Sequence, residues 1–125
     1  MANGFDVSQK AINLWRTLLS DGTVTTKYDL IAIYGVGTSG AWLLRLLDST
    51  GFNNSVFIED DIRKVDFFFQ GRPILTLEEF KKLSAKKIVL VSLDRTSTSK
   101  ILKVLKREKI VVAYIDFVTM KIVLT

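Results

Sequence analysis

Short apolar runs alternate with amphipathic segments along most of this sequence. The apolar runs are rich in β-branched residues and predict buried strands at 30–34, 55–58, 74–75, 87–92 and 110–115. Apolar residues three and four positions apart predict helices at 7–19, 39–49 and 97–108, and a capping box at Thr76 opens a fourth, short helix. Alternating strands and helices are typical of a mostly parallel sheet covered on both faces. The pattern therefore predicts an α/β fold with a Rossmann-like, doubly wound sheet.

The two ends of the chain add to this α/β unit. The helix at 7–19 precedes the first strand, so residues 1–28 are expected to form an extra, N-terminal helical extension. At the other end, residues 120–124 predict a sixth strand at the edge, which gives five or six strands in all. No repeat, low-complexity stretch or linker interrupts the 125 residues. We therefore expect one domain spanning 1–125.

A glycine-rich loop joins the first predicted strand to the next helix. Gly35, Gly37 and Gly40 have the G-x-G-x-x-G spacing, which binds nucleotide phosphates when it stands between a strand and a helix. The first glycine permits a tight turn, the second lets pyrophosphate approach the backbone, and the third allows the helix to pack closely on the strand. The helix N-terminus then faces the anion. A tight turn that binds nothing is the alternative. The predicted phosphate-binding residues are Gly35, Val36, Gly37, Thr38, Ser39 and Gly40.

Acidic residues follow the second strand. Glu59, Asp60 and Asp61 stand about 20 residues past the glycine loop, where a carboxylate in this motif accepts hydrogen bonds from a ribose hydroxyl. Glu59 is the preferred ribose ligand because it lies at the strand end, Asp60 is the second choice, and Asp61 is assigned to a solvated turn. A carboxylate here disfavours a 2′-phosphate, so we expect NAD as the cofactor rather than NADP.

Further polar residues follow the second and fourth strands. Ser92 and Arg95 come directly after the fourth strand and are candidates to contact a phosphate or sugar, the alternative being that this segment only caps the next helix. Arg63, Lys64 and Arg72 come after the second strand and are second-rank candidates for phosphate, since such residues are more often solvated.

Composition restricts the chemistry of the chain. Cysteine and histidine are absent, which excludes disulfides, Cys/His metal sites and a histidine base, so no catalytic residue and no metal ligand is assigned. The net charge of +5 suits a phosphate-bearing small ligand, and the basic segments lack interleaved aromatics, so no nucleic-acid partner is expected. The apolar runs are too short to span a membrane, and the first residues lack the features of a signal peptide. We therefore expect a cytoplasmic protein.

Several segments resemble one protein family. The sequence from Ile33 to Gly40, the strand and acidic turn from Val56 to Asp61, and the segments Gly71–Leu75 and Leu77–Phe80 resemble the N-terminal nucleotide-binding domain of bacterial polysaccharide-biosynthesis proteins. These include nucleotide-sugar dehydratases, epimerases and sugar acyltransferases. The resemblance, which also takes in Val89–Ser92, covers about residues 30–117. It implies a Rossmann-like domain that binds NAD(H) or a nucleotide-sugar, with coenzyme A as a further alternative.

The chain also departs from that family. The family has aspartate where Glu59 stands, and the tyrosine-x-x-x-lysine pair of short-chain dehydrogenases is absent. We therefore expect a stand-alone or excised binding module without a complete active site. The alternatives are a dehydrogenase or epimerase fragment that needs a catalytic domain, and an interaction module that has lost its ligand. Phe67, Phe68 and Phe69 predict an outward aromatic ring, which would mark an oligomer contact, a missing partner domain or ordinary core packing with one ring exposed.

Overall fold

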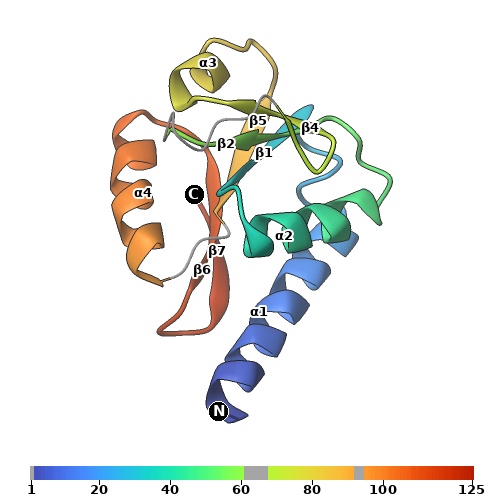
Figure 1. Ribbon diagram of the computed structural model, residues 1–125, viewed down its shortest axis with the longest axis vertical. Helices are drawn as coiled ribbons and strands as arrows, with labels where there is room; N and C mark the ends of the chain where they lie inside the picture. The colour runs from blue at the N-terminus through green and yellow to red at the C-terminus, as the bar shows by residue number, and fades with distance from the viewer. Residues whose placement is uncertain (1, 61–67, 92–94) are drawn as a thin grey trace.

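A computed structural model shows a seven-stranded mixed β-sheet with helices on both sides (Figure 1). The structure describes residues 2–60, 68–91 and 95–125, with side chains from residue 9 onward and, in the last range, from residue 98. The described helices are α1 (Ala2–Ser20), α2 (Thr38–Asp48), α3 (Leu77–Lys81) and α4 (Arg95–Arg107). The described strands are β1 (Leu30–Tyr34), β2 (Ser55–Ile58), β3 (Phe68–Phe69), β4 (Arg72–Leu75), β5 (Lys87–Val91), β6 (Val112–Asp116) and β7 (Lys121–Leu124). None of these helices has both the length and the apolar character that crossing a bilayer requires.

Five central strands run parallel and carry the predicted α/β pattern. The strand order is β3-β4-β2-β1-β5-β6-β7, and β3 and β7 pair antiparallel at the two edges. In the middle of the sheet, Ala32 of β1 lies between Val56 of β2 and Val89 of β5. The chain thus builds outward from β1 through β2 to β4, then returns to the other side of β1 with β5 and continues to β6. This reversal places the carboxyl ends of β1 and β5 side by side.

The expected count of five or six strands is wrong because of a short hairpin at one edge. Gln70 and Gly71 both have positive φ, 52° and 76°, as the favoured two-residue hairpin turns require. The turn therefore lies at 70–71, and the strand predicted at 74–75 begins earlier, so that Arg72 and Pro73 belong to β4 and pair with β3. A two-residue strand leaves no periodic signal, and the sequence pattern missed it.

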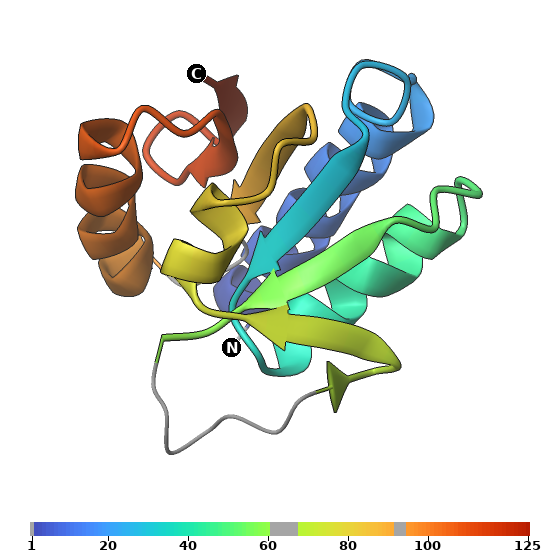
Figure 2. The ribbon, with the colours of Figure 1, turned by 90° about the horizontal axis from the view of Figure 1, so that it is seen from above.

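Helices cover both faces of the sheet, as Figure 2 shows from above. On one face α1 and α2 pack through Trp15, Leu19, Leu43, Leu44 and Leu47 against a cluster that includes Ile31 and Ile33 of β1. On the other face α3 and α4 contribute Leu77, Phe80 and Leu105 to a cluster that includes Ala32 and Tyr34. Alternate residues of β1 therefore point to opposite faces, and β1 is buried throughout.

Of the three consecutive phenylalanines at 67–69, the two that the structure describes have one ring in the core and one ring directed outward. Phe69 packs edge-on against Phe57, with ring centroids 5.0 Å apart and planes at 79°. Phe68 points to the opposite face and is 64% exposed, which confirms one outward ring. Phe67 lies outside the described residues.

Candidate functional site

Two of the three loop glycines are required by the fold itself. Gly35 has a φ of 122°, a conformation that L side chains rarely adopt, and it turns the chain out of β1. At Gly40, a Cβ atom would lie 2.2 Å from the carbonyl oxygen of Gly35 and 3.3 Å from the Phe57 ring. The first turn of α2 therefore packs directly on the backbone at the end of β1, which is the close approach that the motif spacing implied.

Gly37 is different, because nothing in the described structure prevents a side chain there. Its φ of −177° is ordinary extended backbone, and a Cβ atom would meet no atom within 4 Å. Gly37 is the N-cap of α2, no side chain caps this helix, and its first turn contains no acidic residue. The Ala41 N–H donates to the Gly37 carbonyl at 2.9 Å, and the N–H groups before it stand at the start of the helix, where intrahelical acceptors are lacking.

The remaining loop residues divide between solvent and core. Thr38 and Ser39 are exposed on the first turn of α2, so their hydroxyls are accessible to a ligand. Val36 is half-buried and packs against the core cluster under α1 and α2. Val36 can therefore contribute its backbone to a phosphate site but not its side chain.

The acidic turn after β2 contains an interaction that sequence reasoning missed. The Tyr34 hydroxyl donates to Asp60 Oδ2 at 2.8 Å, and the Leu77 N–H donates to Asp60 Oδ1 at 2.9 Å. Asp60 thus joins the end of β1 to the start of α3, and each of its oxygens accepts a hydrogen bond inside the fold. The only signal in the sequence was a tyrosine at the end of an otherwise aliphatic strand.

Tyr34 is held in its neutral form by these surroundings. Burial raises the pKa of its hydroxyl far above the usual range, and the hydrogen bond to Asp60 with the negative charges of Asp60 and Glu59 raises it further. Tyr34 is therefore a hydrogen-bond donor and not a base at neutral pH. Glu59 itself directly follows β2, donates its N–H to the Leu75 carbonyl at 3.0 Å and is half-buried.

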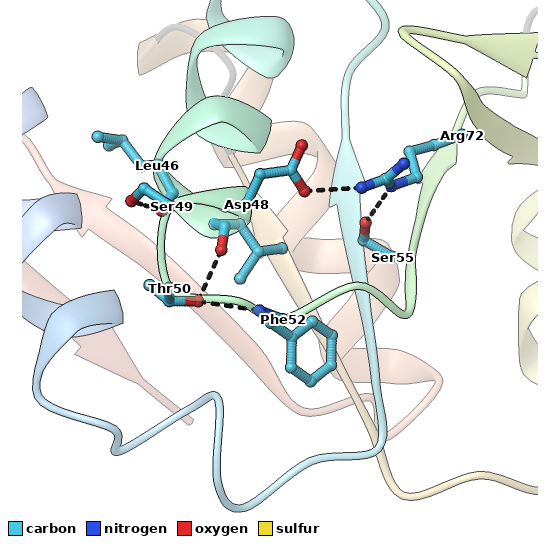
Figure 3. Close-up of polar contacts among 8 residues, drawn as sticks. Leu46, Asp48, Ser49, Thr50, Phe52, Ser55 and Arg72 are labelled. Atoms are coloured by element: carbon cyan, nitrogen blue, oxygen red, sulfur yellow. Dashed lines mark hydrogen bonds and ion pairs between the residues drawn. The ribbon is translucent and has the colours of Figure 1, made fainter.

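Arg72 lies at the opposite edge of the sheet from the glycine loop. Its Nε donates to Ser55 Oγ at 2.9 Å, and its terminal nitrogen contacts Asp48 Oδ1 at 2.7 Å (Figure 3). Asp48 is the last residue of α2, which has 11 residues and is therefore about 16 Å long. The Arg72 side chain therefore cannot reach a phosphate at the first turn of α2. Its contacts instead connect β4 to β2 and to the end of α2, so Arg72 stabilises the fold.

Other candidate residues lie outside what the structure describes. Ser92, Asp61, Arg63 and Lys64 belong to the undescribed segments, and the side chain of Arg95, the first residue of α4, is also outside them. Among the described residues there is no group of three or more acidic side chains that could hold a metal ion.

Comparison with known proteins adds no assignment. No family model, no curated protein and no solved structure matches the chain. What it does must therefore be inferred from the geometry of its own residues.

Proposed function

We propose that this chain is a Rossmann-like nucleotide-binding module that holds the phosphates of NAD(H) or a nucleotide-sugar on the loop Gly35–Gly40. The order of the parallel strands, β4-β2-β1-β5-β6, supports this proposal. Counted along the chain among parallel strands only, it is 3-2-1-4-5, which is the order of the Rossmann half-sheet and its continuation. In such sheets ligands bind outside the carboxyl ends of the strands where the order reverses, and the glycine loop leaves β1 at that point.

The observation that carries the proposal is the environment of Gly37. Gly35 and Gly40 are needed for a turn and for helix packing, whereas a side chain at Gly37 would project into open space. A side chain there would block close approach of a diphosphate to the backbone, and glycine leaves that approach open. The uncapped start of α2 favours an anion at the same place.

Glu59 is the proposed ribose ligand. Asp60 already accepts hydrogen bonds from Tyr34 and Leu77, so its carboxylate serves to fix the turn in which Glu59 stands. A carboxylate at this position would repel the 2′-phosphate of NADP, which favours NAD(H). The proposal assigns no catalytic residue to the chain, and any chemistry on the bound nucleotide would require a partner domain.

Thermal-shift titrations with NAD, NADP, a UDP-sugar and coenzyme A test the proposal. A ligand present at 100 times its dissociation constant stabilises by about 2.7 kcal/mol, which raises the melting temperature of a domain of this size by roughly 10 °C. We expect NAD or the UDP-sugar to produce this shift and NADP to produce a smaller one. The absence of a shift with all four nucleotides would contradict the proposal.

The position of the phosphates is tested by Gly37→Val, with Ala85→Val as its matched control. Both substitutions place the same side chain at an exposed position, and Ala85 lies just before β5, at the opposite edge of the sheet. We expect Gly37→Val to fold normally and to lose the ligand-induced shift, while Ala85→Val keeps it. An undiminished shift in Gly37→Val would mean that the nucleotide binds elsewhere.

A further inference from the structure

Basic residues are concentrated in one part of the chain. Residues 81–109 contain ten of the 18 Lys and Arg residues but only two of the 13 acidic ones, so this segment carries +8 and the rest of the chain −3. The segment comprises the end of α3, β5 and α4, and both helices cover the same face of the sheet (Figure 2). The described cations of these two helices therefore lie on one side of the molecule.

Three of these cations have partners among the described residues: Lys86, whose Nζ lies 5.9 Å from the centroid of the Tyr28 ring, and Lys81 and Lys87. Lys81 contacts Glu78 at 3.1 Å and Glu108 at 2.9 Å, and the second contact joins α3 to the end of α4. Lys87 donates to the carbonyl oxygens of Lys81 and Leu83, so it completes the C-terminal end of α3. Lys81 and Lys87 are therefore explained by the stability of the fold.

Six others form an unpaired group that we call the basic surface. All are exposed, and within the described part of the chain none has an ion pair or side-chain hydrogen bond. The basic surface consists of Lys82, Lys100, Lys103, Lys106, Arg107 and Lys109. Cations in the last turn of α4 favour the helix dipole, but Lys100 lies about two turns earlier, where that effect has faded. The dipole does not account for the whole group.

Three members of the basic surface lie along the outer side of α4. The buried residues Thr98 and Leu105 mark the side of α4 that faces the sheet. Lys100, Lys103 and Arg107 follow a three- and four-residue spacing on the opposite side, with a rise of about 10 Å from first to last. This distance is close to the Debye length of about 8 Å at physiological ionic strength, so the cations act together on one anionic surface.

Nucleotide phosphate at the proposed site would not reach this surface. The glycine loop stands at the carboxyl edge of the sheet against α2, whereas the basic surface lies on the α3–α4 face and continues to the amino edge, where α4 ends. A partner bound to the basic surface would leave the glycine loop accessible.

We propose that the basic surface docks the protein on an anionic lipid bilayer. Five of its six members are lysines, which act as point charges and are depleted from protein–protein interfaces. The sequence of α4 contains no aromatic residue on which the bases of a single-stranded nucleic acid could stack. A bilayer rich in anionic headgroups needs neither feature, since each basic residue near it strengthens binding by about 1 kcal/mol, or roughly fivefold.

Co-sedimentation of the full chain with vesicles tests this proposal. We expect binding to vesicles of 70% phosphatidylcholine and 30% phosphatidylserine, none to pure phosphatidylcholine, and a steep fall between 50 and 500 mM NaCl. The variant Lys100→Gln/Lys103→Gln/Arg107→Gln should lose about a hundredfold in the vesicle partition coefficient. Its melting temperature should stay within a few degrees of the wild type, because none of the three side chains has an ion pair or a side-chain hydrogen bond among the described residues, and Arg107 contributes only through its charge near the end of α4.

The matched control is Lys10→Gln/Arg16→Gln/Arg45→Gln, which lowers the net charge equally on the α1–α2 side, where all three residues are exposed. We expect this variant to bind vesicles within about threefold of the wild type. Equal losses in the two variants would show that net charge alone governs binding and would overturn the proposal. So would failure to bind the anionic vesicles, or anisotropy measurements in which a DNA duplex binds more tightly than they do. These outcomes do not depend on nucleotide binding, which the thermal-shift experiment tests separately.

Discussion

Replacing Gly40 by serine should destabilise the fold, whereas the same replacement at Gly37 should not. A Cβ atom at position 40 would stand 2.2 Å from the Gly35 carbonyl oxygen, about 0.8 Å inside the distance of 3.0 Å that real Cβ atoms keep. The obstacle is backbone at the end of a buried strand and cannot rotate away. Relief requires α2 to move off β1, which disturbs the packing of Leu43, Leu44 and Leu47 in the core.

The magnitude follows from two opposing effects. Overpacking of this kind costs about 3 kcal/mol, at the upper end of the usual range because a backbone atom is involved. Serine has a better helix propensity than glycine and returns roughly half a kcal/mol. We therefore expect Gly40→Ser to lower the free energy of unfolding by about 2 to 3 kcal/mol. At Gly37 the space is open and serine is a favoured N-cap residue, so Gly37→Ser should be neutral or stabilising by a few tenths of a kcal/mol.

Urea denaturation followed by circular dichroism measures both values. For a domain of this size, a loss of 2 kcal/mol lowers the urea midpoint by roughly 1 M. A Gly40→Ser midpoint equal to that of the wild type would refute the close packing of α2 on β1. A comparable loss in Gly37→Ser would refute the freedom of Gly37, on which the proposed phosphate site depends.

Three further predictions concern residues outside the glycine loop, and urea denaturation measures each of them. Lys109 has a φ of 58° where α4 ends, so Lys109→Gly should stabilise by about 0.5–1 kcal/mol, and a loss would contradict this. Asp60→Ala removes the acceptor to which the buried Tyr34 hydroxyl donates and should lower the free energy of unfolding by about 2 kcal/mol. Tyr34→Phe should lower it by only about 1 kcal/mol, because the exposed Asp60 carboxylate can then accept a hydrogen bond from water. The opposite order of the two values would contradict a stabilising role for this hydrogen bond. The Lys81 ammonium lowers the pKa of Glu108 in the folded chain below its value in the unfolded chain. The ion pair therefore stabilises the fold above the unfolded pKa of Glu108, and this stabilisation is lost as pH falls through the lower folded pKa. Lys81→Met should make stability fall less steeply below about pH 4.5, and an unchanged slope would contradict this.

The central strands could be predicted from the sequence because their signal is local. β1 and β2 begin and end where their apolar runs do, and the capping box at Thr76 is present with both of its hydrogen bonds. The fourth helix shows where local signals compete. The apolar run at 110–115 predicted a strand from Ile110, but the Ile110 N–H donates to the Leu105 carbonyl and closes α4, so β6 begins at Val112. The apolar run at 30–34 does not directly follow a helix, so the predicted strand and the observed strand coincide.

The side-chain hydrogen bonds between residues far apart in sequence could not be predicted in the same way. Arg72 was considered for phosphate because of its charge, yet it contacts Ser55 and Asp48, residues 17 and 24 positions away in sequence. Asp60 was considered for ribose, and in the structure its carboxylate accepts a hydrogen bond from Tyr34, 26 positions away. Such partners depend on which strands are neighbours in the sheet and on the register between them. The spacing of residues along the sequence gives neither the strand order nor the register. Charge and position in a motif therefore identified candidate residues without identifying what each one binds.

The glycine loop combines both kinds of information, and this is why Gly37 carries the functional inference. Motif spacing alone gave the three glycines equal weight. The structure assigns Gly35 to a positive-φ turn and Gly40 to a backbone contact, and it leaves Gly37 with extended backbone and open space. A side chain at Gly37 would cost the fold little, so the described structure does not itself require glycine there. An anion close to the first N–H groups of α2, at the reversal point of the strand order, would supply a reason for it.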